Sequence, residues 1–102
     1  VCLLVDDLID TGRTIVKAAE ALKAQGAVGV VVAATHAVFS PPAVEILQSD
    51  FIDQVVVTDT LPIPEDKRWD RLTILPIAPL IARAIHEVFE DGSVTSMFDG
   101  AA

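Results

Sequence analysis

The first fourteen residues, VCLLVDDLIDTGRT, constrain the fold more than any other stretch of the chain. An unbroken apolar run from Val1 to Val5 predicts a strand that is covered on both faces. Two adjacent acids and a short apolar pair follow, and from Ile15 onward the apolar residues recur with helical spacing. We therefore expect a buried strand that leads through an acidic, hydroxyl-bearing loop into the N-terminus of a helix.

The remainder of the chain repeats this alternation of strand and helix. Three further segments are predicted to be strands because each is short and apolar: Val28–Ala34, Ile52–Val57 and Leu72–Ile77. Three segments have helical spacing: residues 15–25 with a stop at Gly26, Ala43 to about Gln48, and Pro79 onward with a stop at Gly92. Because proline cannot donate a hydrogen bond within a sheet, Pro76 indicates that the last predicted strand either lies at a sheet edge or ends at this residue. The expected fold class is α/β, an open parallel sheet with flanking helices and a right-handed βαβ unit at its start.

Side-chain patterns assign faces to two of the helices. The apolar stripe of the first helix is Ile15, Ala18, Ala19 and Leu22. The last helix is expected to turn Leu80, Ile81, Ala84, Ile85 and Val88 inward, and Arg83, His86, Glu87 and Glu90 outward. Ser40 before two prolines predicts an N-cap for the short middle helix. The proline-bearing, charged segment Leu61–Arg71 predicts a surface loop.

Composition narrows the classes of partner. The 102 residues allow one domain at most, and no apolar run approaches the roughly 18 residues needed to cross a bilayer, so we expect no membrane span. The formal net charge of −8 argues against binding long nucleic acids.

The single cysteine, Cys2, is expected to be a buried, reduced thiol in a cytoplasmic protein. Because the chain opens inside a strand, we expect it to be part of a longer protein.

The loop has the chemistry of a sugar phosphate site. Asp6 and Asp7 follow an apolar strand, where desolvation is unfavourable, so they are expected to meet a cation or hydroxyl groups. Thr11, Gly12 and Thr14 offer hydroxyls and an unhindered backbone at a helix start, which suits a phosphate monoester. Alternatively, Asp10 and Thr11 cap the helix while the two acids lie in solvent.

Several segments resemble a known family. Val5–Thr14 resembles the phosphoribosyl diphosphate binding loop of the type I phosphoribosyltransferase fold. Four later segments follow in the order found in the C-terminal domain of the ribose-phosphate pyrophosphokinase family: Ala34–Ser40, Val55–Pro62, Ala78–Ile85 and Gly92–Phe98. On this resemblance, residues 1–102 are a C-terminal, phosphoribosyltransferase-like domain of a longer chain.

The resemblance implies a transferase that moves the diphosphoryl group of ATP to the 1-hydroxyl of ribose 5-phosphate, with Mg²⁺, in a homo-oligomer. It implies that Asp6 and Asp7 contact the sugar and that Asp10, Thr11, Gly12, Arg13 and Thr14 surround the 5-phosphate. It implies no direct metal ligand in this chain, and catalytic and adenine-binding residues that lie elsewhere in the family's longer chain. Ser93, Thr95 and Phe98 match positions of a regulatory phosphate or ADP site between subunits.

Arg13, the function and the charged segment each have more than one interpretation. Arg13 departs from the glycine of most family members, and it either points outward or adds a contact to phosphate. A nucleobase phosphoribosyltransferase or regulator of the same fold, or a non-catalytic synthetase-associated subunit, is the alternative function. His36 is interpreted as a strand-end residue and His86 as exposed, whereas the charged segment Glu65–Trp69 is either solvated or an interface.

Overall fold

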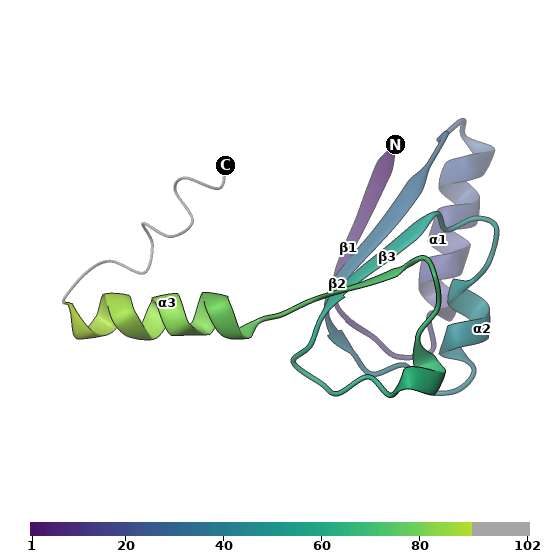
Figure 1. Ribbon diagram of the computed structural model, residues 1–102. Helices are drawn as coiled ribbons and strands as arrows, with labels where there is room; N and C mark the ends of the chain where they lie inside the picture. The colour runs from purple at the N-terminus through teal and green to yellow at the C-terminus, as the bar shows by residue number, and fades with distance from the viewer. Residues whose placement is uncertain (91–102) are drawn as a thin grey trace.

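A four-stranded parallel sheet of order β1-β2-β3-β4 forms the body of the computed structural model, which describes residues 1–90 (Figure 1). The strands are β1 (Cys2–Ile9), β2 (Val30–Ala37), β3 (Gln54–Thr58) and β4 (Leu72–Leu75). The helices are α1 (Arg13–Ala24), α2 (Ala43–Leu47), the 3₁₀ helix η1 (Glu65–Lys67) and α3 (Ala78–Phe89). The expected α/β class and parallel sheet are confirmed, and β4, which ends before Pro76, is an edge strand.

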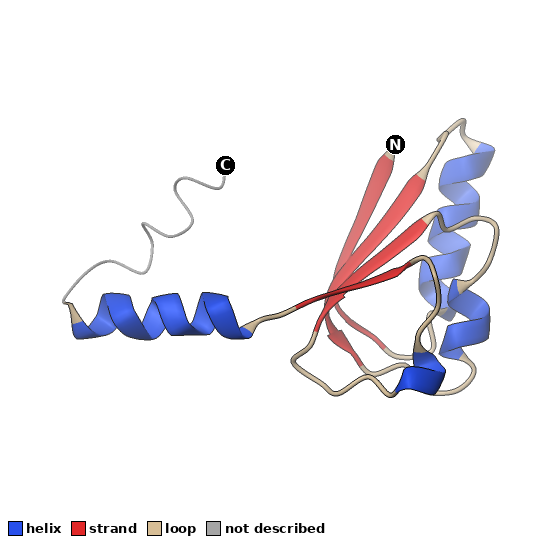
Figure 2. Ribbon diagram, in the orientation of Figure 1, coloured by secondary structure: helices blue, strands red, loops and turns tan. Residues whose placement is uncertain are grey.

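Within residues 1–90, only one of the two faces of the sheet is covered. Helices α1 and α2 lie on the same face (Figure 2), against alternate strand residues such as Val32 and Val55 that are fully buried. The side chains of the intervening strand residues point to the other face of the sheet, and among them Val5 is 72% exposed. The expectation that the opening strand is covered on both faces is therefore wrong for the described residues, since Leu3 is exposed as well.

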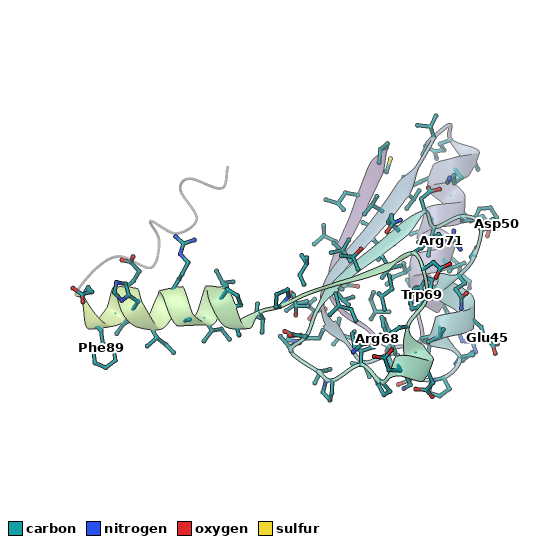
Figure 3. All side chains as sticks on the ribbon, in the orientation of Figure 1. Glu45, Asp50, Arg68, Trp69, Arg71 and Phe89 are labelled. Atoms are coloured by element: carbon teal, nitrogen blue, oxygen red, sulfur yellow. The ribbon has the colours of Figure 1, made fainter. Side chains whose placement is uncertain are left out.

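Helix α3 extends away from the sheet and covers neither face (Figure 1). None of its residues is buried, and Ile85 and Val88 are 54% and 65% exposed. Figure 3 shows Phe89 at the far end of the helix, away from the strands. The helix and its apolar stripe form as expected, but the inward orientation predicted for that stripe is wrong, because no described element packs against it.

Local boundaries follow from hydrogen bonds. Gly26 ends α1 as expected: its φ is 100°, its N–H donates to Lys23 O, and Ala27 N–H donates to Leu22 O. The N-cap expected at Ser40 is wrong. The residue before α2 is Pro42, and Ser40 instead accepts a bond from Ala43 N at 2.9 Å through its backbone carbonyl.

The segment Leu61–Arg71 runs over the surface as expected and is anchored to the core by two side chains. Ile63 is buried, and the Trp69 ring lies 5.8 Å from the Phe39 ring, centroid to centroid. Arg68 donates to Ile63 O through Nε and Nη2 at 3.1 and 2.9 Å. The segment is the expected surface loop, since most of its residues, including Glu65 and Asp66, are exposed, and Ile63 and Trp69 anchor it to the core.

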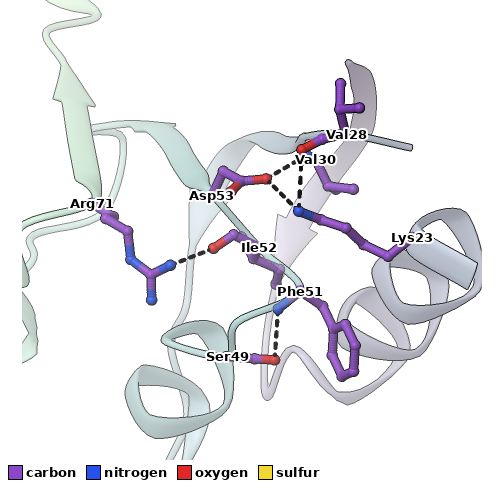
Figure 4. Close-up of polar contacts among 8 residues, drawn as sticks. All are labelled: Lys23, Val28, Val30, Ser49, Phe51, Ile52, Asp53 and Arg71. Carbon is purple, nitrogen blue, oxygen red and sulfur yellow. Dashed lines mark hydrogen bonds and ion pairs between the residues drawn. The ribbon is translucent and has the colours of Figure 1, made fainter. Parts of the chain in front are cut away.

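Asp53 joins three elements at the opposite end of the sheet (Figure 4). Its Oδ2 accepts the Val30 N–H at 2.7 Å and the Lys23 ammonium at 3.1 Å. The bond from Val30 and then the bond from Lys23 lower the pKa of the Asp53 carboxyl below its ordinary value of 3.8. The charged form of Asp53 is thus favoured by folding.

We expect Asp53→Asn to loosen the start of β2 at neutral pH and to have little effect in acid. Because folding lowers this pKa, the stabilisation is complete above the ordinary value of 3.8 and is lost as pH falls through the folded value. Hydrogen exchange at Val30 N–H should therefore be faster in the variant than in the wild type near pH 7, and the two rates should converge well below pH 3.8. Asp50→Asn, at an exposed position nearby, is the control.

Within residues 1–90, no helix combines the length and apolar character that a membrane crossing requires. Cys2 is a free thiol on β1. It is half-buried rather than buried: it lies on the covered face, opposite Val30, but at the start of the edge strand β1.

Candidate functional site

Strand β1 carries both acids inside its last half. The expected loop after Val5 is wrong in this respect, since the strand continues to Ile9. Pairing with β2 explains the extension, because Leu8 and Ile9 lie opposite His36 and Ala37. Successive strand residues point to opposite faces, so Asp6 and Asp7 are turned apart. Only the N–H of Asp7 reaches back, donating to Asp6 Oδ1 at 2.8 Å.

The turn into α1 depends on Gly12. Its φ of 80° and ψ of 3° are left-handed, a conformation that glycine adopts without steric penalty. Gly12 is the N-cap, and its carbonyl accepts the first helical bond, from Val16 N at 3.0 Å. No side chain of the described residues caps the helix, so the interpretation that Asp10 or Thr11 serves as a cap is wrong. The N–H groups of the first turn are left for an external acceptor.

A pocket of about 180 Å³, here called the β1–α1 pocket, lies over this turn. Its lining consists of Asp6, Leu8, Asp10, Thr11, Gly12, Arg13, Thr14 and Ile15. The residues predicted to bind ribose 5-phosphate, except Asp7, are thus brought together around one space. A neighbouring concavity of about 150 Å³ shares Asp6 and Thr14 but is otherwise lined by apolar side chains, which suit an anion poorly.

The charges around the pocket are exposed. Asp6, Asp10 and Arg13 are all exposed, and the two ion pairs within residues 1–90, Lys23–Asp53 and Arg68–Glu65, include none of them. Arg13 also lines a second concavity, beside Lys17 and Glu20. The pocket therefore combines a helix N-terminus and a guanidinium, which attract a phosphate, with carboxylates that accept hydrogen bonds from hydroxyl groups.

Polar side chains also gather where β2 and β3 end, at the same edge of the sheet as the acids of β1. His36 Nδ1 lies 2.7 Å from Thr60 Oγ1, and Thr58 Oγ1 donates to Thr35 O at 2.6 Å. Sequence reasoning missed the pairing of His36 with Thr60, although adjacent parallel strands bring their carboxyl ends together. His36 lies within β2 near its end and His86 is exposed, which confirms both interpretations.

The described residues contain no group of three or more His, Cys, Asp or Glu side chains that could hold a metal ion. Ser93, Thr95 and Phe98, the predicted regulatory residues, and the helix stop at Gly92 lie outside the described residues.

Comparison with known proteins identifies relatives of the whole chain. Residues 1–99 match the family model of the phosphoribosyl synthetase-associated domain. The chain is 60% identical to a ribose-phosphate pyrophosphokinase of Bifidobacterium longum over 98 residues, which cover 96% of this chain and 29% of the relative. It is 58% identical to the ribose-phosphate pyrophosphokinase of Streptomyces avermitilis over 99 residues, 97% of this chain and 31% of the relative.

A solved structure agrees with these relatives. The crystal structure of phosphoribosylpyrophosphate synthetase from Mycobacterium smegmatis superposes with a TM-score of 0.81 at 53% identity, covering 89% of this chain and 30% of that one. The chain therefore spans about 30% of the length of the relatives it matches.

Proposed function

The chain belongs to the phosphoribosyl synthetase-associated domain family, and from that premise we propose that it is the ribose 5-phosphate binding part of a ribose-phosphate diphosphokinase. The full-length enzyme transfers the β,γ-diphosphoryl group of ATP to the 1-hydroxyl of ribose 5-phosphate and releases AMP. We propose further that residues 1–102 form a C-terminal domain of the phosphoribosyltransferase type, in a cytoplasmic homo-oligomer. The names of the relatives support the reaction.

One observation carries the assignment of the substrate. The N-terminus of α1 has no side-chain cap and opens into the β1–α1 pocket, which is lined by two carboxylates, two threonines and an arginine. An anion is stabilised by the free N–H groups and by the positive end of the helix dipole. Carboxylates beside it would repel a second anion but accept bonds from hydroxyls. A phosphorylated sugar meets both requirements.

Each residue then has a proposed role. The 5-phosphate binds the N–H groups of the first turn of α1 and the hydroxyls of Thr11 and Thr14. Asp6 accepts hydrogen bonds from the ribose hydroxyls, whereas Asp7 lies on the other face of β1, outside the pocket lining, and contributes only its negative charge. Arg13 lines the same pocket, and its charge adds attraction for phosphate. The sugar is thereby held for in-line attack of its 1-hydroxyl on ATP, a reaction in which positioning supplies much of the rate.

The family's reaction also uses Mg²⁺, for which the resemblance places no direct protein ligand in this chain. We propose that Mg²⁺ arrives with ATP and that the catalytic groups lie in other parts of the full-length enzyme. The described chain is thus assigned binding and orientation of the acceptor sugar and no step of the chemistry.

Two alternative functions use the same pocket. A nucleobase phosphoribosyltransferase or regulator would need a base-binding element, and none is identified among the described residues. A non-catalytic associated subunit would keep the fold for assembly, but retention of the carboxylates and threonines of the pocket favours a domain that binds substrate.

The test uses the full-length protein with ATP and ribose 5-phosphate. We expect AMP and phosphoribosyl diphosphate to form, and Thr14→Ala to raise KM for ribose 5-phosphate roughly 10- to 100-fold, because a hydrogen bond to a charged group contributes roughly 1.5–3 kcal/mol. KM for ATP should not change. Thr73→Ala, on an exposed position of β4, is the matched control.

Residues 1–102 alone should make no product. Absence of AMP formation by the full-length protein would contradict the proposed reaction. An unchanged KM for ribose 5-phosphate in Thr14→Ala would contradict the proposed phosphate site.

A further inference from the structure

The backbone at Gly12 rests directly on α2. Gly12 is buried, and a Cβ built on it would lie 2.9 Å from Leu47 Cδ2 and 3.1 Å from Leu47 Cγ. Leu47 is itself fully buried, at the last position of α2. The turn that opens the β1–α1 pocket is therefore packed closely against α2, chiefly against the Leu47 side chain and also beside Ile46.

The position of this leucine is fixed by polar contacts around the end of α2. Arg71, which precedes β4, donates from Nη2 to Gln48 O and from Nη1 to Ile52 O, both at 2.7 Å (Figure 4 shows the bond to Ile52). Arg71 O in turn accepts the Val55 N–H at 3.0 Å. The hydrogen bonds of Arg71 thus tie the end of α2 to the sheet. The Leu47 side chain is presented to Gly12 from this fixed end of the helix.

We propose that Leu47 is a positioning residue for ribose 5-phosphate. Its side chain keeps Gly12 in the left-handed conformation that directs the first-turn N–H groups of α1 into the β1–α1 pocket. The proposal rests on the proposed function, and it adds a residue that lines neither that pocket nor its apolar neighbour. Removing the support leaves the N–H groups intact but allows the turn to shift, and misplacement by about 1 Å is enough to weaken a preorganised site.

The first test compares buried substitutions in the full-length enzyme. Leu47→Ala should raise KM for ribose 5-phosphate about tenfold with KM for ATP unchanged, and Leu47→Met, which conserves volume, should restore it. Ile52→Ala removes the same number of carbon atoms from an equally buried position and should leave both KM values unchanged. If Leu47→Ala does not fold, Leu47→Val carries the same comparison with a smaller cavity.

The second test is a double-mutant cycle, which reports coupling between two residues in contact. Gly12→Ala places a methyl group against Leu47, and Leu47→Ala removes both atoms of the clash. Gly12→Ala should therefore raise KM for ribose 5-phosphate by a smaller factor in the Leu47→Ala background than in the wild type.

Additive effects, or equal effects of Leu47→Ala and Ile52→Ala on KM, would overturn the positioning role. If Leu47→Ala has no effect while Thr14→Ala raises KM for ribose 5-phosphate, the proposed function stands and the role of Leu47 fails. If neither variant changes KM, both fail.

Discussion

Asp6→Asn in the full-length enzyme is expected to raise KM for ribose 5-phosphate on the order of 100-fold, because charge-assisted bonds to two ribose hydroxyls are weakened by about 1.5 kcal/mol or more each. Asp7→Asn is expected to raise it by less than about threefold, in the range of an exposed surface change. The two acids are adjacent and identical in type. The difference follows from their position on β1, where only Asp6 lines the β1–α1 pocket.

Steady-state kinetics with ribose 5-phosphate as the varied substrate measure both variants. Each substitution removes one negative charge from neighbouring positions, so Asp7→Asn controls for the change in net charge. An equal or larger effect of Asp7→Asn would show that the sugar approaches from the other face of β1, contrary to the proposed arrangement.

Element order could be predicted from the sequence because it is encoded locally. Apolar runs that include Val30, Val32 and Val55 are short and continuous, and residues 15–25 have helical spacing. Gly26 marks a helix end by the conformation it adopts. Such signals require only neighbours along the chain.

The extent of β1 could not be predicted, because two adjacent acids disfavour a strand when they are considered alone. Pairing of Leu8 with His36 and of Ile9 with Ala37 overrides this preference. Both pairs join residues distant in sequence, so the signal is absent from the opening segment.

Exposure of apolar side chains could not be predicted for a related reason. Periodicity shows that α3 has an apolar stripe, but it does not identify what covers the stripe. Val5 and Ile85 are apolar and exposed in the described residues, where no element packs over them. The sequence pattern predicts which side chains are apolar, whereas their burial depends on which elements pack against them.

The types of residue in the candidate site were evident from the sequence, whereas its geometry was not. Asp10, Thr11 and Thr14 indicate polar chemistry at a helix start under any arrangement. Only the structure shows that Gly12, and no side chain, is the N-cap and that Leu47 lies against it. These two facts distinguish an open anion site from an ordinary capped helix.

Alanine substitutions at three glycines distinguish the effects of backbone strain, side-chain contact and substrate binding. Gly12 combines a φ of 80° with the close approach of Leu47, Gly26 has a φ of 100° with nothing within 4 Å of a built Cβ, and Gly29 has its nearest contacts at 3.5 Å. The expected loss of stability on substitution by alanine is within about 0.5 kcal/mol for Gly29→Ala. It is about 1–2 kcal/mol for Gly26→Ala, from the left-handed backbone alone.

Gly12→Ala is expected to have the largest effect of the three. The same backbone penalty is joined by overpacking against Leu47, for a total loss of roughly 2–5 kcal/mol. Because the turn must move to accommodate the methyl group, KM for ribose 5-phosphate should also rise on the order of 100-fold or more. Urea unfolding and steady-state kinetics of the full-length variants measure the two effects separately.

Comparison of Gly12→Ala with Gly26→Ala tests whether the turn acts in binding as well as in folding. Both variants strain the backbone at an end of α1, one at the N-cap and one just after the C-terminus. If the turn binds phosphate, only Gly12→Ala should change KM for ribose 5-phosphate, because the N–H groups that face the β1–α1 pocket belong to the first turn. A loss of stability in both variants with KM unchanged in both would assign Gly12 to folding alone and remove the anion site from this helix.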